Sequence, residues 1–513
     1  MGEDEARGLR PDLLLFAAFF ATLPLYSPNL SLFQDGFADA GPVMGVVAPT
    51  MLVAAVACGR GAAVLAARGR GGALLRPGAV VAGAVLYVGG YALLAAQLAS
   101  GASPGVVAVA AGLLLAVGSV GLCVAWGAGL ACLGLRRALV LMGLTVGCGS
   151  VLELLIAAVP VAVGVPVVGA LAVAAGAVPC AWALRGGWPG SSAAPASAAA
   201  GTPEAGAQDA AAEPGEAEAP FAGEPGGAAD DAGAFCREEG ESLSRLLRRM
   251  AGVLAVPLVG LLVFGYITGV RRFMMFDVVY MEALGGLLAG LVAVPLGRAR
   301  TRRPLLPFLH QVVLPAFALV LIVLNSFPEA TPPLWVAAWL SYVFFGLVAI
   351  LALASLCAMA HAGEFPPALV YGAAVAGYAV VSLLGQVSGT TAPFEAQNGG
   401  PALLVVSTLY FVFLLASSLA AGWRVEERAP SDAASDGAAA LAERCARVAG
   451  ERGLSPREGE ILGYLGRGHT VAFIAKTLVI SESTVRTHVK AVYRKLGVSS
   501  REELLEFIDG PAR

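Results

Sequence analysis

The sequence predicts an all-α protein, a polytopic membrane helix bundle of about twelve spans followed by a C-terminal domain of about four helices. The 513 residues are 58% hydrophobic and 13% charged, whereas a soluble domain has about 25% charged residues. Apolar stretches of about 20 residues, the length that crosses a bilayer, recur along the chain. The last 60 or so residues, by contrast, are polar and carry about four short amphipathic patterns.

The apolar stretches form two groups of about six, separated by a polar segment. The first group comprises residues 12–31, 42–67, 78–100, 104–134, 138–160 and 162–184. The second comprises 250–270, 275–296, 305–325, 332–360, 366–388 and 401–423. Residues 186–245 are rich in Ala, Gly, Pro, Ser and Glu, so we expect a disordered acidic linker that cannot bury enough apolar surface to fold. The predicted domains are 1–185, the linker 186–245, 246–423, a second linker 424–453, and 454–513.

Arginines concentrate in alternate short loops, which predicts the orientation of the bundle because such loops stay in the cytoplasm. The residues concerned are Arg68, Arg70, Arg76, Arg136, Arg137, Arg245, Arg248, Arg249, Arg298, Arg300, Arg302, Arg303, Arg424 and Arg428. The opposite loops carry acidic residues. We therefore expect a multi-pass protein of the bacterial cytoplasmic (inner) membrane, in contact with lipid and with both termini in the cytoplasm. One arginine pair, Arg271 and Arg272, departs from the pattern at the outer end of the seventh span.

The two groups of six spans, divided by a long loop, resemble the major facilitator superfamily in architecture over residues 12–423. That resemblance implies two halves around a cavity near the middle of the bilayer. The loop between the second and third spans, RGAAVLAARGRGG, lacks the Asp-Arg signature that those transporters usually carry there.

The C-terminal domain begins near Leu454 and reads as short capped helices. Ser455 is a predicted N-cap, with Pro456 in the first helical position and Glu458 placed for a capping box. A second helix is predicted at about 471–478, and a third from after Ser481 to about Leu496. Apolar residues of the third helix follow the spacing of a core stripe, namely Val485, Val489, Val492 and Leu496.

The opposite face of the third helix is polar and basic, with Ser483, Thr487, Lys490 and Arg494 at helical spacing and Arg486 beside them. Such a stripe fits a DNA major groove. On a helix without further sequence motifs, however, a basic stripe is more often only a solvent-exposed face. The ordered elements LSPRE-x-E-I-L, IA-x-x-L-x-ISESTVRTHV-x-x-x-Y-x-KLGV and SREEL resemble the DNA-binding domains of the LuxR/NarL/FixJ family.

The resemblance implies that the third helix reads double-stranded DNA. Its base-contacting positions match Arg486, Thr487 and Lys490, and its phosphate contacts match Thr484, His488 and Arg494. It further implies a homodimer, formed through the fourth helix on a pseudo-palindromic operator. Val471, Ala472 and Phe473 depart from the more usual Asn-Lys-Glu of the family.

Ionisable residues inside spans are costly and point to function or to internal pairing. We expect five such residues in the outer half of the bundle to bind a small ligand: Glu153, Arg271, Arg272, Asp277 and Glu282. Anchoring at the interface or internal ion pairs would be the alternative roles. Near the inner side, His310, Gln311, His361 and Glu364 are candidates to relay the state of the bundle, or are simply interfacial.

No nucleophile and base pair, metal cluster or cofactor loop is recognisable, and the eight cysteines are scattered singly, so we expect no enzyme, metal or cofactor. The sequence predicts a one-component membrane regulator whose bundle senses a small ligand and controls the DNA-binding domain. A transporter with a fused regulatory domain is the alternative, and a bundle that serves only as an anchor is a third.

Overall fold

The computed structural model of the protein describes residues 10–189 except 31, 34, 35, 38 and 39, then 243–271, 278–299, 309–324, 327, 332–391, 400–422, 435–467, 469–498 and 501–509. The regular structure in these ranges is helical, without a strand. This confirms the all-α fold class. Most of the predicted linker 186–245 and part of 424–453 lie outside the described residues.

Described helices overlap each of the predicted spans. The first half contains α1 (Pro11–Leu14), α2 (Phe16–Thr22), η2 (Ser27–Leu30), α4 (Ala40–Ala67), η3 (Gly71–Leu75), α5 (Pro77–Ala99), α6 (Val106–Leu130), α7 (Leu135–Ala157) and α8 (Val161–Leu184). The second half contains α9 (Leu243–Arg271), α10 (Val278–Arg298), η5 (Leu309–Val313), α12 (Leu314–Leu324), α13 (Pro332–His361), α14 (Pro367–Gly389) and α16 (Gly400–Gly422).

Seven of these helices are long and apolar enough to cross a membrane, judged by length and composition over the described residues. They are α4, α5, α6, α7, α8, α14 and the part of α13 from Trp339 to His361. Shorter apolar helical segments occupy the other predicted spans. The bundle is therefore that of a multi-pass membrane protein.

The first predicted span, 12–31, differs most from expectation, because it is divided among α1, α2 and η2 instead of forming one helix. α2 ends at Thr22, two residues before Pro24, and Pro28 lies within η2. Proline lacks the amide hydrogen of an α-helix and clashes with the preceding turn, which explains why no continuous helix forms here.

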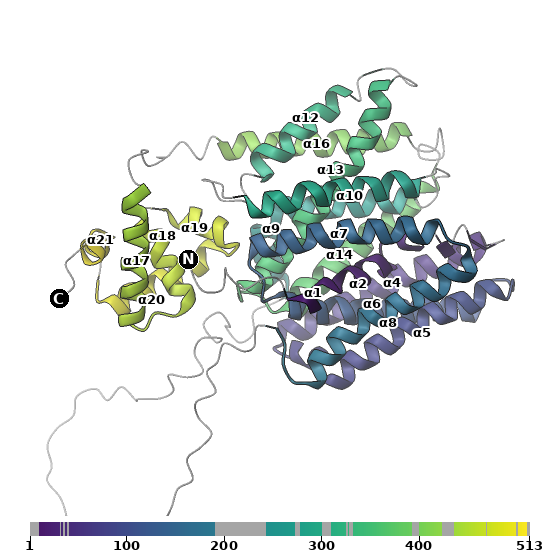
Figure 1. The fold of residues 1–513 in the computed structure, drawn as a ribbon, viewed down its shortest axis with the longest axis horizontal. Coiled ribbons are helices and arrows are strands. Elements are labelled where there is room, and N and C mark those ends of the chain that lie inside the picture. Colours follow the sequence, from purple (N-terminus) through teal and green to yellow (C-terminus); the bar gives the residue numbers. More distant parts are fainter. Residues whose placement is uncertain are drawn as a thin grey trace, which may run out of the picture.

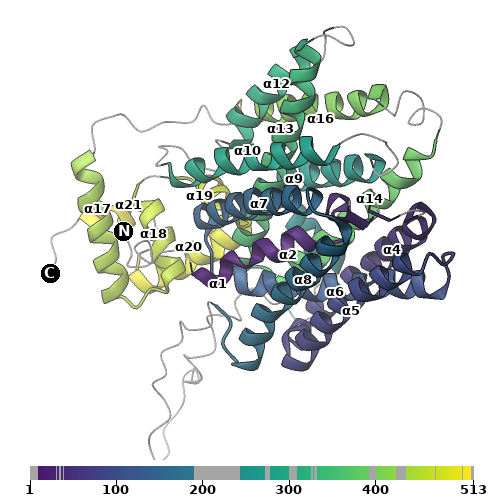
Figure 2. The ribbon, with the colours of Figure 1, turned by 45° about the vertical axis from the view of Figure 1, so that its right-hand side comes forward.

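The two halves meet along α4 with α14 and α7 with α10, helices that are distant in sequence but lie side by side (Figures 1 and 2). Glycines allow this approach: a Cβ atom at Gly59 of α4 would lie 2.6 Å from the carbonyl oxygen of Gly372 in α14. Small residues at crossing points are how membrane helices pack closely.

The C-terminal domain consists of α17 (Ser435–Glu451), α18 (Pro456–Gly466), α19 (Val471–Leu478), α20 (Glu482–Leu496) and α21 (Arg501–Asp509). Its apolar core includes the predicted stripe residues Val485, Val492 and Leu496, with Val489 packed against it. The core also includes Cys445 of α17. The segment expected as a second linker thus contributes α17 to the fold of this domain.

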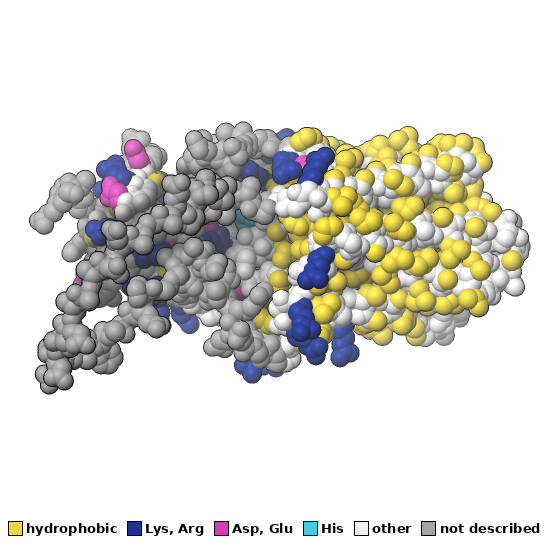
Figure 3. Space-filling view, turned by 90° about the horizontal axis from the view of Figure 1, so that it is seen from below, with side chains coloured by type: hydrophobic (Ala, Val, Ile, Leu, Met, Phe, Trp, Pro, Cys, Tyr) yellow, Lys and Arg dark blue, Asp and Glu magenta, His cyan; other side chains and the backbone are white. Residues whose placement is uncertain are grey.

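The C-terminal domain lies against one end of the bundle in both views of the fold (Figures 1 and 2). Lys and Arg side chains gather at this end, next to the hydrophobic surface of the bundle (Figure 3). Exposed arginines at the helix ends of the bundle are Arg68, Arg70, Arg76, Arg185, Arg245, Arg248 and Arg298. We refer to this end as the arginine-rich end.

Candidate nucleic-acid interface and bundle cavity

The start of α18 is tied to the end of α20 by one carboxylate. The predicted capping box is present: the Ser455 N–H donates to Glu458 Oε2 at 2.7 Å, and the Glu458 N–H donates to Ser455 Oγ at 3.3 Å. Lys495 Nζ of α20 donates to the same Oε2 at 2.8 Å. Partial burial acts to raise the pKa of Glu458, but the hydrogen bonds from Lys495 and Ser455 outweigh it and lower the pKa.

A tight turn joins α19 to α20 and forms the helix-turn-helix. Thr470 caps α19 by accepting from the Phe473 N–H, and Ser481 caps α20 by accepting from the Thr484 N–H at 3.2 Å. Between the helices, Val479 adopts a left-handed conformation with φ of 57°, which is rare for a β-branched residue. The predicted bounds of both helices are confirmed.

The predicted base-contacting face of α20 is accessible. Arg486 has a side chain that is 66% exposed and donates to Glu482 at 3.1 Å one turn earlier. Thr487 donates its hydroxyl to the Ser483 carbonyl at 3.1 Å, and Lys490 and Arg494 are exposed. The basic side chains of this face therefore remain accessible to solvent.

The neighbouring face of α20 is less accessible. Thr484 is only 6% exposed, and His488, one turn later, is partly buried. Burial and the nearby Arg457 guanidinium hold the pKa of His488 below its usual value, although the Glu458 and Glu364 carboxylates act in the opposite direction. Two of the six predicted DNA contacts are therefore buried or partly buried.

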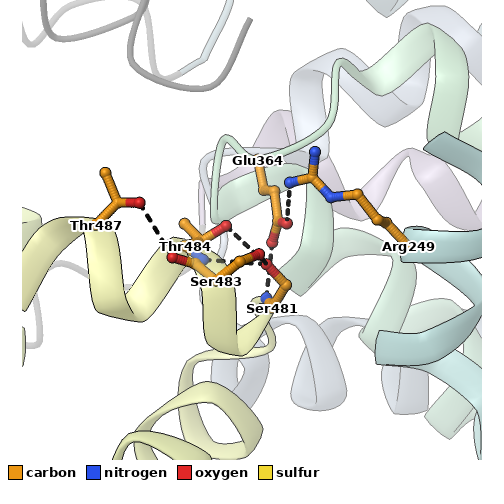
Figure 4. A network of polar contacts seen from close by, with 6 residues as sticks. All are labelled: Arg249, Glu364, Ser481, Ser483, Thr484 and Thr487. Carbon is orange, nitrogen blue, oxygen red and sulfur yellow. Dashed lines mark hydrogen bonds and ion pairs between the residues drawn. The ribbon is translucent and has the colours of Figure 1, made fainter. Parts of the chain in front are cut away.

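The C-terminal domain contacts the bundle at a buried carboxylate, which belongs to the loop between α13 and α14 (Figure 4). The Glu364 side chain is 0% exposed; its Oε1 accepts from Arg249 Nη2 of α9 at 2.9 Å, and its Oε2 accepts from the Ser481 backbone N–H at 2.9 Å. The Arg249 guanidinium also lies 5.7 Å from the centre of the Phe365 ring.

The sequence indicates Glu364 and His361 as candidates but does not indicate the partner of either. His361 Nδ1 lies 2.8 Å from the Ala131 carbonyl oxygen, so it connects the end of α13 to the end of α6. In the sequence, Arg249 is recognisable only as one of the arginines that predict the orientation of the bundle. No sequence signal places Ser481 beside Glu364, because 117 residues separate them. The side chains of His310 and Gln311 are outside the described residues.

A cavity of about 160 Å³ lies between the two halves of the bundle. α2, α6 and α7 line it from one half and α9, α10, α13 and α14 from the other. Four aromatic rings along its wall stack in sequence: Phe20 on Tyr26 at 6.2 Å, Tyr26 on Phe264 at 5.8 Å and Phe264 on Phe345 at 6.4 Å between centroids. An apolar cavity of roughly 150 Å³ is large enough for a benzene-sized ligand.

Glu153 of α7 is the one charged residue among the described residues that line the cavity. It is also the one predicted ligand residue whose position can be given. Arg272 and Asp277 lie outside the described residues, and so do the side chains of Arg271 and Glu282. The expected cluster of five ionisable residues thus stays a prediction apart from the placement of Glu153.

A capped helix-turn-helix with an accessible basic face, joined to an apolar helical bundle, defines the class of a membrane-associated DNA-binding protein. Within this class, residues 452–508 match the family described as "Bacterial regulatory proteins, luxR family". This C-terminal segment is therefore a LuxR-type helix-turn-helix domain, as its motifs indicate.

The curated relatives match about a tenth of this chain. The probable transcriptional regulatory protein NarL of Mycobacterium tuberculosis is 48% identical over 48 residues, which cover 9% of this chain and 22% of the relative. The transcriptional activator protein BglJ of Escherichia coli K12 is 47% identical over 58 residues, covering 11% of this chain and 26% of the relative. The chain thus spans about a quarter or less of the length of these relatives.

Two solved structures are similar over most of the chain. The human organic anion transporter MFSD10 (TETRAN) has a TM-score of 0.42 and 16% identity, and the alignment covers 79% of this chain and 96% of the transporter. The major facilitator superfamily transporter FucP, in its outward conformation, has a TM-score of 0.46 and 14% identity, over 80% of this chain and 98% of the transporter.

Proposed function

We propose that this protein is a membrane-bound regulator of transcription whose bundle senses a small ligand and controls DNA binding by the C-terminal domain. The observation that carries the proposal is the physical contact between the start of the recognition helix, at Ser481, and Glu364 of the bundle. A bundle that served only as an anchor would need no such contact with the DNA-binding surface. The domain family supports DNA as the partner.

The proposed orientation places the C-terminal domain in the cytoplasm, where the chromosome is. The domain lies at the arginine-rich end of the bundle, and basic loops stay on the cytoplasmic side of bacterial membranes (Figure 3). The domain then reaches DNA without release from the membrane. A second copy is expected to pair with it on a pseudo-palindromic operator.

The proposed ligand is small, largely apolar and cationic. The stacked rings from Phe20 to Phe345 offer apolar surface and ring faces, which attract cations. Glu153 adds a carboxylate to the same cavity. A carboxylate in the wall favours a cation over an anion.

The test uses the full chain in lipid nanodiscs and two probes of similar size, benzyltrimethylammonium and benzenesulfonate, with binding measured by calorimetry. Benzyltrimethylammonium should bind and benzenesulfonate should not. Glu153→Gln should weaken binding of the cation by about tenfold, as expected for loss of one charged contact in a partly desolvated site. A Glu451→Gln control changes an exposed charge on α17, outside the bundle, and should have no effect.

Equal binding of both probes, or no effect of Glu153→Gln, would contradict the proposed ligand class. Reconstitution into proteoliposomes separates sensing from the alternative of transport. Binding of benzyltrimethylammonium without uptake supports a sensor. Saturable uptake driven by an ion gradient would favour a transporter with a fused regulatory domain.

A further inference from the structure

We infer that the arginine-rich end of the bundle is a docking surface for the protein's own DNA-binding domain, and that docking there excludes DNA. The inference rests on the proposed function and concerns its regulation. The docking contact consists of Glu364, Arg249 and the Ser481 N–H (Figure 4).

The chemistry of the docking contact makes it specific. Both oxygens of the buried Glu364 carboxylate are engaged, one by the Arg249 guanidinium and the other by the Ser481 N–H, each at 2.9 Å. Burial of a carboxylate is unfavourable unless its charge and lone pairs are satisfied. The C-terminal domain supplies one of these two partners, so a docked domain stabilises the buried charge and a departing domain exposes it to water.

The same position is needed for DNA. Helix-turn-helix proteins enter the major groove with the N-terminal residues of the recognition helix. Backbone N–H groups at helix N-termini are donors to DNA phosphates. α20 is 15 residues long, and its N-terminal turn already holds the Glu364 carboxylate at Ser481. A protein anion therefore occupies the place that a DNA phosphate would take.

Apolar contacts surround this polar one. Val479, the left-handed residue of the turn, is 3% exposed and belongs to the apolar cluster of the bundle. Ala362, beside Glu364, packs against the core of the C-terminal domain. The buried Thr484 has its hydroxyl oxygen 2.8 Å from that of Ser481. The turn of the helix-turn-helix is thus covered by the bundle, and the domain cannot present it to DNA until it undocks.

The docking contact is also connected to the cavity. Arg249 lies near the start of α9, which lines the cavity with Leu261, Phe264, Ile267 and Thr268. Glu364 lies between α13 and α14, which line it from the other side. A ligand that favours a different spacing of α9 from these helices would separate Arg249 from Glu364. Differential affinity for the two spacings is sufficient to shift the docking equilibrium.

The test compares the wild-type full chain with Glu364→Ala in nanodiscs, using a fluorescein-labelled duplex of random sequence and fluorescence anisotropy at fixed salt. Phosphate contacts dominate such binding, so the competition is measurable without the operator. Glu364→Ala should bind the duplex about tenfold more tightly, because charged hydrogen bonds have about this effect on an equilibrium. Glu364→Gln, which keeps the shape of the side chain, should give a smaller increase.

Glu451→Ala is the matched control. It changes the net charge by the same amount as Glu364→Ala, but it removes an exposed carboxylate of α17, outside the bundle. Its affinity should stay within about twofold of wild type, as expected for a screened surface charge. Benzyltrimethylammonium should increase the affinity of the wild type and leave that of Glu364→Ala unchanged.

Hydrogen–deuterium exchange reports docking without DNA. The peptide that contains Ser481 should exchange about tenfold faster in Glu364→Ala than in wild type, because its N–H loses a buried acceptor. Equal duplex affinity of the two proteins, or an unchanged exchange rate, would overturn the inference. Absence of duplex binding by both would instead refute DNA binding as the function, and the exchange rates would still decide whether the docking contact forms.

Discussion

Glu458 offers a direct test of how the helix-turn-helix domain is held together. The carboxylate joins the start of α18 to the end of α20, since it accepts from the Ser455 N–H at 2.7 Å and from Lys495 Nζ at 2.8 Å. Loss of the hydrogen bond from the Ser455 N–H, which is the half of the capping box that Glu458 supplies, costs about 1 kcal/mol. Loss of the hydrogen bond to Lys495 adds about 1 kcal/mol, at the lower end for a charged pair because the Lys495 side chain is 35% exposed and screened.

We therefore expect Glu458→Ala to lower the free energy of unfolding of the domain by about 2 kcal/mol. For a domain of this size, that change lowers Tm by about 8–16 °C. Residues 435–513 include the helices that form their own apolar core, so thermal unfolding can be followed by circular dichroism on this domain alone. Glu458→Gln retains a hydrogen-bond acceptor and should lose about half as much.

Glu460→Ala is the control for a neighbouring acidic residue on the same helix. The Glu460 side chain is 52% exposed and forms an ion pair with Arg457, so its loss should cost about 0.5 kcal/mol or less. A decrease in Tm no larger for Glu458→Ala than for Glu460→Ala would refute the reasoning.

The Glu458 contribution should also depend on pH with a definite sign. Its pKa in the folded domain is lowered, so the folded state favours the ionised carboxylate. The stability advantage of the wild type over Glu458→Ala is then fully present above the unfolded pKa of about 4.3. It is lost as the pH falls below that value and through the folded pKa. The difference in Tm should be constant from pH 8 to 6 and shrink below about pH 4.5.

Two further predictions concern the DNA face and the bundle. Arg486→Ala should weaken binding to a selected operator by about 1–3 kcal/mol and relax the sequence preference at one base pair. The Tm of the domain should be nearly unchanged, because the Arg486 side chain is 66% exposed. An unchanged sequence preference would show that Arg486 does not contact a base. Gly372→Ala should destabilise the detergent-solubilised chain by about 1–3 kcal/mol, since the added Cβ would lie 2.8 Å from the Gly59 carbonyl oxygen. Gly377→Ala in the same helix meets its nearest atom at 3.5 Å and should be neutral or stabilising; similar melting of the two variants would contradict the packing argument.

Local patterns were sufficient to predict the elements of the C-terminal domain. The Ser455 and Glu458 capping box, the helix at 471–478 and the helix from Ser481 to Leu496 all depend on interactions within one or two turns. The packing of α17 into the core of the domain is not predicted by local patterns, because its polar sequence contains only a short apolar edge. Cys445 becomes a core residue only when α18 and α21 pack against that edge.

The sequence by itself determined the helical bundle, because apolar stretches of bilayer length have few other stable arrangements, and it determined the LuxR-type domain through local helix signals. Tertiary structure decided which helices of the two halves meet, that Glu153 lies on the cavity wall, and that Glu364 contacts the recognition helix. These outcomes join residues far apart in the chain, and hydropathy and helical periodicity carry no information on such pairs. The contact between Glu364 and Ser481 crosses 117 residues and two domains, so only the folded arrangement could reveal it.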